Sequence, residues 1–578
     1  MINVGTKENP SYLPAEVCVV VPGQAYNGQL DPNQTQHMIR FAVRRPWENA
    51  NSIVDQGFQT AGLSPQGNIL LVGFLMVIRC IANFNQGSFG ISVPQKLITV
   101  QGRVLNEPKV VYRGNSTAVV QSGSWNMLKV KFNATGVKLK KWSFLLISTP
   151  NSRDAFPNEP SLVAVVDELH RSLEATGVLA DKPAKGRRIV VNEIDDPVVE
   201  NSLKLAAGSL DLLFIILPKA NDPLYPRIKQ LADVKYGIQT ICSVGEKLAK
   251  EKGQDQYLKN LALKFNLKLG GTNQIVDNLR LSIINEDKTM VVGIDVTHPS
   301  PGSSANAPSV AGMVASIDKL LGQWPATIRI QSRARKEEVD NLAEMLKHHL
   351  DLWKTKGRHL SFPENILVYR DGVSEGQYGK VINEELPQLR QACKEKYPPA
   401  DQKNGLPRLT IIIVGKRHHT RFYPITVQTA DRFSNPKPGT IVDRGVTEAH
   451  NWDFFLQPHA ALQGTARPAH YYVLLDEIFQ QRYKTIPQPF HNVADVLEDL
   501  THAMSYAFGR ATKAVSICPP AKYADMVCER ARHYLSSLFD TPTHSMAASV
   551  AGSTHGGAQA TNDDVRVHQR LRDTMFYI

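Results

Sequence analysis

The chain has 578 residues, of which 42% are hydrophobic and 21% charged, a composition typical of globular domains. Its net charge of +12 makes an acidic polymer such as nucleic acid a plausible partner. The longest apolar run, residues 69–78, is too short to cross a bilayer and ends at Arg79, so we expect no membrane partner.

The six cysteines form no C-x-x-C pair, which argues against a zinc ribbon and against a disulfide framework. A reducing compartment fits this pattern best. The first twenty residues lack the apolar core of a signal peptide. We therefore expect a cytoplasmic, and possibly also nuclear, protein.

The first part of the chain shows no catalytic constellation. Residues 1–22 contain what reads as a single strand without a hairpin partner, which predicts the end of a module rather than a domain. Residues 23–140 combine short strands at 97–100 and 128–132 with a polar amphipathic stretch near 32–60. We interpret them as a connecting subdomain.

From about residue 141, strands and helices alternate, which predicts α/β domains with largely parallel sheets. The first series has strands at 142–148 and 210–217, a helix at 162–176 and another from about 222. The second series starts at 290 and has strands at 327–330, 366–369, 409–414 and 515–518, with helices at roughly 336–355 and 520–538.

The second series opens on an apolar strand that delivers one carboxylate to its exit. Residues 291–294 are continuously apolar, as in a strand buried on both faces, and Asp295 follows them. An ionised aspartate is costly inside such a core, whereas α/β sheets bind ligands at their strand ends. A capping or turn role for Asp295 is the alternative.

Further acids are predicted at the same sheet edge. Asp371 follows the strand at 366–369, either Glu337 or Glu338 could reach back from the turn after 327–330, and Asp525 lies on the helix after 515–518. Clustered carboxylates repel one another unless a cation neutralises them, and hard oxygen ligands favour Mg²⁺ or Mn²⁺. Two such ions are the usual clamp for hydrolysis of a phosphodiester. Unrelated surface acids remain the alternative.

A second constellation is basic. Tyr225 and Lys229 are four residues apart near a helix start, hence on one helical face, and Lys264 and Lys268 flank another helix end. Helix starts suit anions because free N–H groups point outward there. Solvated lysines beside a core tyrosine are the alternative interpretation.

Four blocks in register carry a resemblance to a known family. They are Gly293–Pro299, Tyr369–Gln377, Lys416–Arg421 and Gly464–Tyr471, and together they resemble the PIWI domain of a eukaryotic Argonaute protein. The resemblance covers nearly the whole chain. It implies an α/β fold class, with a MID domain built on a Rossmann-like parallel sheet followed by a PIWI domain with an RNase H-like fold.

The same resemblance implies a domain order in which the amino-terminal domain and most of PAZ are missing. The expected parts are a carboxy-terminal remnant of PAZ at 1–22, a linker subdomain between PAZ and MID at 23–140, MID at 141–275 and PIWI at 285–578.

The resemblance also assigns roles to residues. Asp295, Glu337, Asp371 and Asp525 match the catalytic, metal-binding tetrad, with Glu338 still open as the glutamate. The pocket for the guide's 5′ phosphate would contain Tyr225, Lys229, Lys264, Lys268 and Arg530. The guide backbone would be contacted by Arg421, His459, Arg467, Arg510 and Ser516.

Three local features complete the comparison with the family pattern. Ile241 stands where many relatives have glutamine, and Gln239 or Thr240 could take over its contact with phosphate. Lys522 replaces a usual tyrosine. The end of the chain, residues 575–578, resembles the family's apolar tail, which packs beside the 5′ pocket.

The function implied is small-RNA-guided silencing: binding of a 5′-phosphorylated guide RNA and Mg²⁺- or Mn²⁺-dependent cleavage of a complementary target RNA, together with silencing-complex proteins. One alternative is a guide-binding effector that does not cleave and acts through recruited partners. A DNA-guided relative is another, against which the Lys229, Lys264 and Lys268 set argues.

Overall fold

The computed structural model describes residues 2–4, 9–19, 30, 32–61, 93–150, 152, 154–300, 303–304, 306–402, 405–539 and 559–578. The chain forms two compact units, residues 1–44 and 45–578, each described here by itself. The apolar run at 69–78 lies outside the described residues. Among the helices that are described, none is long and apolar enough to cross a membrane.

The first unit contains a short hairpin and a helix. Strand β1 (Ile2–Asn3) pairs antiparallel with β2 (Tyr12–Leu13), and η1 (Ala15–Val17) and α1 (Pro32–Ala42) follow. The expectation of one unpaired strand in residues 1–22 is therefore wrong. Two-residue strands are too short to show an alternating pattern in the sequence.

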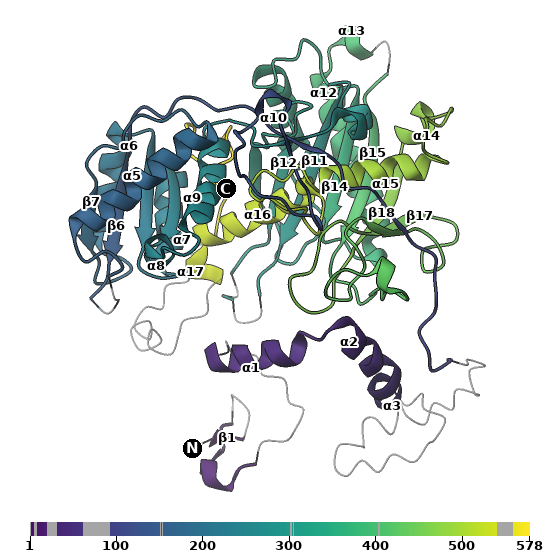
Figure 1. Ribbon diagram of the computed structural model, residues 1–578, viewed down its shortest axis with the longest axis horizontal. Coiled ribbons are helices and arrows are strands. Elements are labelled where there is room, and N and C mark those ends of the chain that lie inside the picture. The colour runs from purple at the N-terminus through teal and green to yellow at the C-terminus, as the bar shows by residue number, and fades with distance from the viewer. Residues whose placement is uncertain are drawn as a thin grey trace. The chain divides into compact units, whose positions relative to one another are not determined.

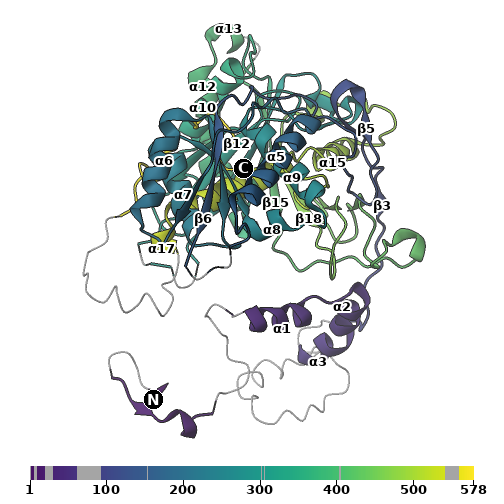
Figure 2. The same cartoon turned by 60° about the vertical axis from the view of Figure 1, so that its left-hand side comes forward.

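The second unit contains a four-stranded parallel sheet. Its strands are β6 (Trp142–Ser148), β7 (Arg187–Val190), β8 (Leu212–Leu217) and β9 (Gln239–Val244), in the order β7-β6-β8-β9. All six residues of β8 are buried, as its apolar sequence predicts. Helices α5 (Glu159–Thr176) and α9 (Gln254–Lys268) cover one face, and α6 (Pro197–Ser209) and α7 (Leu224–Lys229) cover the other (Figure 2).

Local signals set the ends of α5. The Asn158 side chain accepts a hydrogen bond from the Ser161 N–H at 2.9 Å, and a proline occupies the first turn. The helix ends at Gly177, whose φ of 92° lies in the left-handed region that glycine adopts without strain.

The second sheet has nine strands and is mixed. Its order is β13-β12-β11-β14-β15-β18-β17-β16-β3, in which β11, β14 and β15 run parallel to one another. The strands are β3 (Arg103–Val104), β11 (Thr289–Thr297), β12 (Val310–Ala315), β13 (Ala326–Ile330), β14 (Asn365–Asp371), β15 (Arg408–Gly415), β16 (Thr440–Val442), β17 (Trp452–Gln457) and β18 (Ala469–Asp476).

Helices cover both faces of this sheet, so its central strands are buried. On one face lie α10 (Leu342–Thr355) and α12 (Leu386–Lys396); on the other lie α15 (Val493–Met504) and α16 (Pro519–Tyr534). Helix α16 contacts β11 and β12 and then reaches α7 beside the four-stranded sheet (Figure 1). A Cβ at Gly293 would lie 2.0 Å from the Pro520 carbonyl oxygen, so only glycine allows β11 and α16 to approach this closely.

The remaining elements are short. They are α2 (Pro46–Ser52), η2 (Ile53–Gly57), α3 (Phe58–Thr60), β4 (Val110–Val111), η4 (Arg113–Asn115), β5 (Thr117–Ala118), η5 (Gln230–Tyr236), α8 (Gly245–Ala249), β10 (Ile275–Val276), η6 (Asn278–Arg280), η7 (Ser282–Ile284), η8 (Glu375–Gln377), α11 (Tyr378–Lys380), η9 (Val381–Glu385), α13 (Pro399–Gln402), η10 (Val427–Thr429), α14 (Phe479–Arg482) and α17 (Ser536–Phe539).

Three of the predicted strands are wrong. Residues 97–100, 128–132 and 515–518 are irregular in the structure. Near the last of these, only an isolated bridge joins Lys513 to Ser124. The first two runs are largely exposed, with Leu97, Ile98 and Leu128 at the surface, whereas Ile517 and Cys518 of the third are buried. None of the three has a neighbouring strand to pair with among the described residues, which periodicity cannot reveal.

Candidate metal centre and anion pocket

Two candidate carboxylates end adjacent parallel strands. Asp295 lies near the exit of β11 and Asp371 is the last residue of β14, and the register pairs Ile294 with Arg370. The two aspartates therefore occupy neighbouring positions at the same edge of the nine-stranded sheet, where α/β proteins bind ligands.

The third carboxylate is Glu337. A Cβ at Gly372 would lie 3.2 Å from Glu337 Oε1 and 3.4 Å from Asp295 Oδ1, so both oxygens border the same small space. Glu338 is buried elsewhere and pairs with Lys380 at 2.8 Å. Of the two glutamates that the sequence left open, the structure places Glu337 beside the aspartates.

Two residues that sequence reasoning missed hold Glu337 in place. His298 Nε2 lies 2.6 Å from Glu337 Oε2, and the fully buried Arg370 donates to the Glu337 carbonyl oxygen at 2.6 Å. Arg370 also pairs with the buried Glu385 at 3.1 Å. The sequence contained one signal for the contacts of Arg370: an arginine that directly follows the apolar residues 366–369 is buried and needs a carboxylate partner.

The fourth carboxylate, Asp525, is on α16 and forms an ion pair with Lys522 one turn earlier. Burial raises the pKa of Asp295 to about 6, and the charge of Asp525 contributes. Burial raises the pKa of Asp371 to about 8, with Asp295 and Asp525 as the next causes. The three aspartates thus repel one another, and a bound cation would relieve this repulsion.

The donor set fits Mg²⁺ or Mn²⁺, because all four side chains offer carboxylate oxygens and no thiolate. Among the described residues, no three of the four carboxylates have ligand atoms within 4.8 Å of one another. No three of these carboxylates are therefore close enough, as they stand, to bind one ion together. The acids that are this close, Asp443, Asp495 and Glu498, instead surround the guanidinium of Arg103.

The basic residues gather between α7, α9 and α16. Lys229 is buried and donates to Thr240 Oγ1 at 2.7 Å, and its Nζ lies 5.5 Å from the centre of the Tyr225 ring. Lys268 is also buried and donates to the Phe576 carbonyl oxygen at 2.6 Å. The expected packing of residues 575–578 beside this pocket is present.

Arg530 joins the pocket to α16. Its guanidinium pairs with Asp233 at 2.7 Å and donates to the Tyr225 hydroxyl at 3.2 Å. It also donates to the carbonyl oxygens of Phe576 at 2.9 Å and Tyr577 at 3.1 Å. Two segments that are distant from α16 in sequence, residues 225–233 and the end of the chain, therefore converge on one buried arginine.

The pocket holds more positive charge than its surroundings neutralise. Burial lowers the pKa of Lys264 to about 8, and the charges of Arg510, Lys229 and Arg530 add to the effect. Burial also lowers the pKa of Lys268 well below its ordinary value, with Lys229 as the next cause. Such a site is built to receive an anion.

The position of Ile241 has polar residues beside it on the same strand. Ile241 itself is buried in the core of the sheet. Its neighbours Gln239 and Thr240 accept hydrogen bonds from Lys268 at 3.4 Å and from Lys229 at 2.7 Å. Polar side chains of β9 therefore do reach the lysines, from the two positions named as substitutes.

Comparison with known proteins decides the family. The Piwi domain model matches residues 212–536, more than half of the chain, and the Argonaute linker 2 domain model matches residues 48–112. The chain belongs to the Argonaute family. The expected fold class, a MID-like parallel sheet followed by an RNase H-like PIWI domain, is confirmed.

Among its Argonaute relatives, protein argonaute 5 of Arabidopsis thaliana is 31% identical, over 100% of this chain and 55% of its own length. Protein argonaute 1B of Oryza sativa subsp. japonica is 32% identical, over 96% and 48%. The chain thus spans about half the length of these curated relatives.

Solved structures agree. Kluyveromyces polysporus Argonaute with a guide RNA is 25% identical with a TM-score of 0.76, covering 100% of this chain and 62% of that one. The MID-PIWI domains of Neurospora QDE-2 (N. crassa) are 32% identical with a TM-score of 0.56, covering 78% of this chain and all of that one.

The five expected guide-backbone residues of this Argonaute do not form one cluster. Arg421 donates to the carbonyl oxygens of His418 at 2.9 Å and Thr420 at 2.7 Å. Burial lowers the pKa of Arg421, and the charge of the exposed Arg467 lowers it further. The exposed Arg510 instead lies toward Lys264.

The other two expected backbone contacts are uncharged. Burial lowers the pKa of His459 to about 4, with Lys513 and Lys416 as further causes, so its imidazole is neutral at pH 7. Ser516 is half-buried in the segment before α16. Both can donate hydrogen bonds to phosphate oxygens, but neither adds positive charge.

Proposed function

We propose that this Argonaute binds a guide RNA by its 5′ phosphate and cleaves complementary RNA with the help of a divalent metal. The observation that carries the proposal is the meeting of Asp295, Glu337 and Asp371 at one sheet edge, with Asp525 facing them from α16. The same α16 also supplies Arg530 to the cationic pocket, so one helix connects both sites.

The proposal assigns a part to each region. Residues 141–275 act as MID, residues 285–578 as PIWI, residues 23–140 as the linker and residues 1–22 as the end of PAZ. The match of the linker 2 model to residues 48–112 supports the third assignment. The partners are a small guide RNA, a complementary target RNA and proteins of a silencing complex.

Guide binding uses the excess positive charge of the pocket. Lys229, Lys264 and Lys268 attract the terminal phosphate, and Arg530 fixes the Tyr225 hydroxyl so that the ring is oriented for stacking on the first base. A stacked base contributes about 1–3 kcal/mol and tolerates any sequence. Sequence specificity then comes from base pairing, while the protein contacts the backbone.

For cleavage, the four carboxylates would hold Mg²⁺ or Mn²⁺, which when bound activates water and stabilises the leaving oxygen. The protein's own residues prepare this site. Arg370 and His298 fix the position of Glu337, whose Oε1 lies 3.4 Å from Arg370 Nη1 and borders the same small space as Asp295 Oδ1. Asp371 has to lose its proton before it can serve as a ligand. Because its pKa is raised, cation binding would be accompanied by release of this proton.

The test is a cleavage assay with a 5′-phosphorylated guide RNA, a matched 5′-labelled target and added Mg²⁺. We expect one cut in the paired region, loss of cutting with EDTA, and loss of cutting in Asp371→Asn with guide affinity retained. Asp255→Asn, an exposed acid paired with Lys259, is the matched control. Cutting that persists in Asp371→Asn would contradict the proposal.

A guide-binding effector that does not cleave is the second candidate. The Lys522–Asp525 ion pair and the wide spacing of the carboxylates favour it. Tight guide and target binding without product, in Mg²⁺ and in Mn²⁺, would establish it. A preference for DNA guides in a direct competition would instead favour a DNA-guided relative.

A further inference from the structure

A cavity of about 160 Å³ lies at the edge of the four-stranded sheet that is opposite to the guide pocket. Its walls are Leu145 of β6, Leu213 of β8 and Leu205 and Ala206 of α6, and Lys185 and Arg187 border it from the β7 side. The guide pocket involves β9, at the other edge of the sheet. The cavity is therefore a separate feature of this domain.

The charges around the cavity have one sign. Lys185 and Arg187 form no ion pair with any described residue, and no carboxylate lines the cavity. On the other face of β7, Arg188 does pair, with Asp154. Of these three cationic side chains, the two without an ion-pair partner among the described residues therefore lie on the face that carries the cavity.

The hydroxyl groups that line the cavity already use their protons inside the protein. Ser143 Oγ donates to the Lys185 carbonyl oxygen at 3.1 Å, Ser202 Oγ to Val198 at 2.7 Å and Ser209 Oγ to Leu205 at 3.1 Å. They offer no free proton to a ligand. Recognition of an anion here consequently depends on Lys185 and Arg187.

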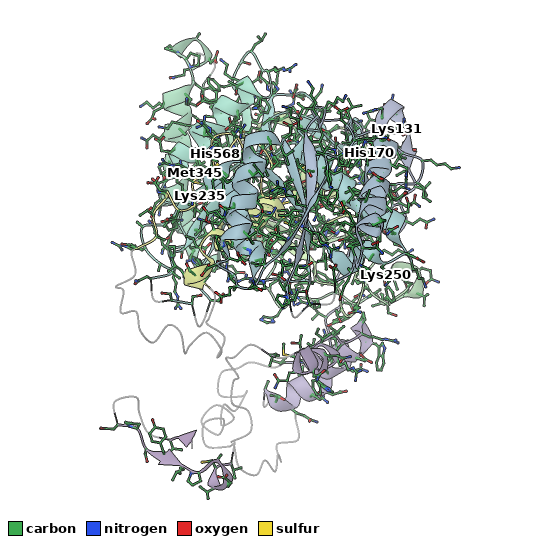
Figure 3. The ribbon with its side chains drawn as sticks, turned by 90° about the vertical axis from the view of Figure 1, so that its left-hand side faces the viewer. Lys131, His170, Lys235, Lys250, Met345 and His568 are labelled. Carbon is green, nitrogen blue, oxygen red and sulfur yellow. The ribbon has the colours of Figure 1, made fainter. Side chains whose placement is uncertain are left out.

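The strand beside the cavity is an open sheet edge. β7 pairs with β6 on one side, and no described strand pairs with its other side (Figure 3 faces this end of the molecule). Arg187, Arg188 and Val190 are exposed, while Ile189 packs toward α6 on the cavity face. An exposed edge of this kind is a template for one more strand.

The approach to the edge is shaped by one glycine. A Cβ at Gly186 would lie 2.2 Å from the Phe144 ring, so the backbone that leads into β7 lies directly on that ring. The Ser143 hydroxyl holds the same stretch by sharing its one proton between the carbonyl oxygens of Ala184 at 3.2 Å and Lys185 at 3.1 Å. The edge is therefore held in place without an added strand.

We propose that this edge binds an acidic segment of a partner protein, which extends the sheet beside β7 and inserts one large apolar side chain into the cavity. Backbone hydrogen bonds to β7 give the register, and carboxylates on the segment meet Lys185 and Arg187. A cavity of about 150 Å³ accommodates one benzene ring, so an aromatic side chain fits. Opposite charge favours an acidic segment over a basic one.

The test measures fluorescence anisotropy of a labelled octapeptide with a central phenylalanine, flanking valines and acidic residues at its ends. The protein is the full chain. We expect the double variant Lys185→Glu with Arg187→Glu to weaken binding about tenfold or more. Leu205→Glu, at a half-exposed wall position, should weaken it similarly. The exposed pair Lys250→Glu with Lys252→Glu is the matched charge control.

Three altered peptides test the parts of the proposal. Replacing phenylalanine by alanine, replacing the acids by lysine, and inserting a proline that prevents strand pairing should each reduce affinity at least about tenfold. If the proline peptide binds as tightly as the original peptide, or if phenylacetate alone competes as well as that peptide does, the proposal of an added strand is wrong. Unchanged binding in the Lys185 and Arg187 variant, with an unaltered melting temperature, would overturn the site.

Discussion

The Lys522 ammonium forms an ion pair with the Asp525 carboxylate one turn along α16, at the edge of the candidate metal centre. Both side chains are partly exposed, so the pair is weak in itself. Its importance is that Lys522 occupies Asp525 Oδ2, one of the two oxygens that this carboxylate offers to a cation. A lysine at this position therefore competes with the metal.

The first prediction concerns this competition. Lys522→Ala should lower the Mg²⁺ concentration for half-maximal cleavage by about 1.5- to fivefold, because an exposed pair is worth about 0.2–1 kcal/mol. A Mg²⁺ titration at saturating guide measures this. Lys522→Arg keeps the pair and should behave like the unaltered chain. A higher Mg²⁺ requirement in Lys522→Ala would show that the lysine assists the site.

Charge repulsion between Asp295, Asp371 and Asp525 predicts a stability change. Without divalent ions at pH 7.5, Asp371→Asn should raise the free energy of unfolding by about 2 kcal/mol. Burial, and then the charges of Asp295 and Asp525, raise the pKa of Asp371 to about 8, so the folded chain has to take up a proton that the unfolded chain does not hold, and asparagine removes this cost. Mg²⁺ should stabilise the unaltered chain but not the variant. Thermal unfolding with EDTA and with Mg²⁺ checks both, and Asp255→Asn should be neutral. A destabilised variant in EDTA would contradict the repulsion.

The two neighbouring glutamates provide a matched pair. Glu337→Gln should reduce cleavage at least about 100-fold, whereas Glu338→Gln should leave it unchanged, because Glu338 pairs with Lys380 away from the site. His298→Ala should cost about 10- to 100-fold, since it releases Glu337 Oε2. Single-turnover rates at saturating guide measure all three. Equal losses in both glutamate variants would mean that Glu338 also contributes.

Guide binding should depend on pH through Lys264. Its folded pKa of about 8 lies below the ordinary value of 10.5, so the unfolded chain binds more protons between these values and this residue favours folding increasingly as pH rises through that window. A bound phosphate favours the charged lysine. Affinity for a 5′-phosphorylated guide should therefore fall roughly tenfold between pH 7 and pH 9.

Two controls isolate this effect. Lys264→Arg keeps its charge above pH 9 and should flatten the profile. A guide with a 5′ hydroxyl should show a much smaller pH dependence. Filter binding at constant ionic strength gives both profiles, and parallel slopes for the two guides would exclude Lys264 as the cause.

The ion pairs of Arg103 attach the linker region to the nine-stranded sheet. It lies on β3 and pairs with Asp443, Asp495 and the buried Glu498, whose pKa is raised to about 8, first by burial. Arg103→Ala leaves these acids uncompensated and should cost about 2–3 kcal/mol, less than a fully buried pair because Arg103 is about one-third exposed. Urea unfolding measures the loss, and Arg444→Ala, at an exposed arginine near Asp443, should be nearly neutral.

Sequence patterns predicted the sheet cores well. The apolar runs at 142–148, 366–369 and 409–414 are β6, β14 and β15, because strands buried on both faces must be continuously apolar. The same reasoning failed at 515–518, where the apolar residues are buried in an irregular segment before α16. Burial determines composition, but hydrogen-bond pairing depends on a neighbour that the local sequence does not contain.

The chemistry of the sites divides in the same way. The sequence by itself determined which residue types stand at the strand ends and helix ends, including Asp295, Asp371, Lys229 and Lys268, because these follow from local pattern and family resemblance. Only the tertiary structure separated Glu337 from Glu338 and brought Arg370 and His298 to Glu337. It also revealed the open edge at β7. These outcomes depend on contacts between segments far apart in the chain, and such contacts are set by packing rather than by local sequence.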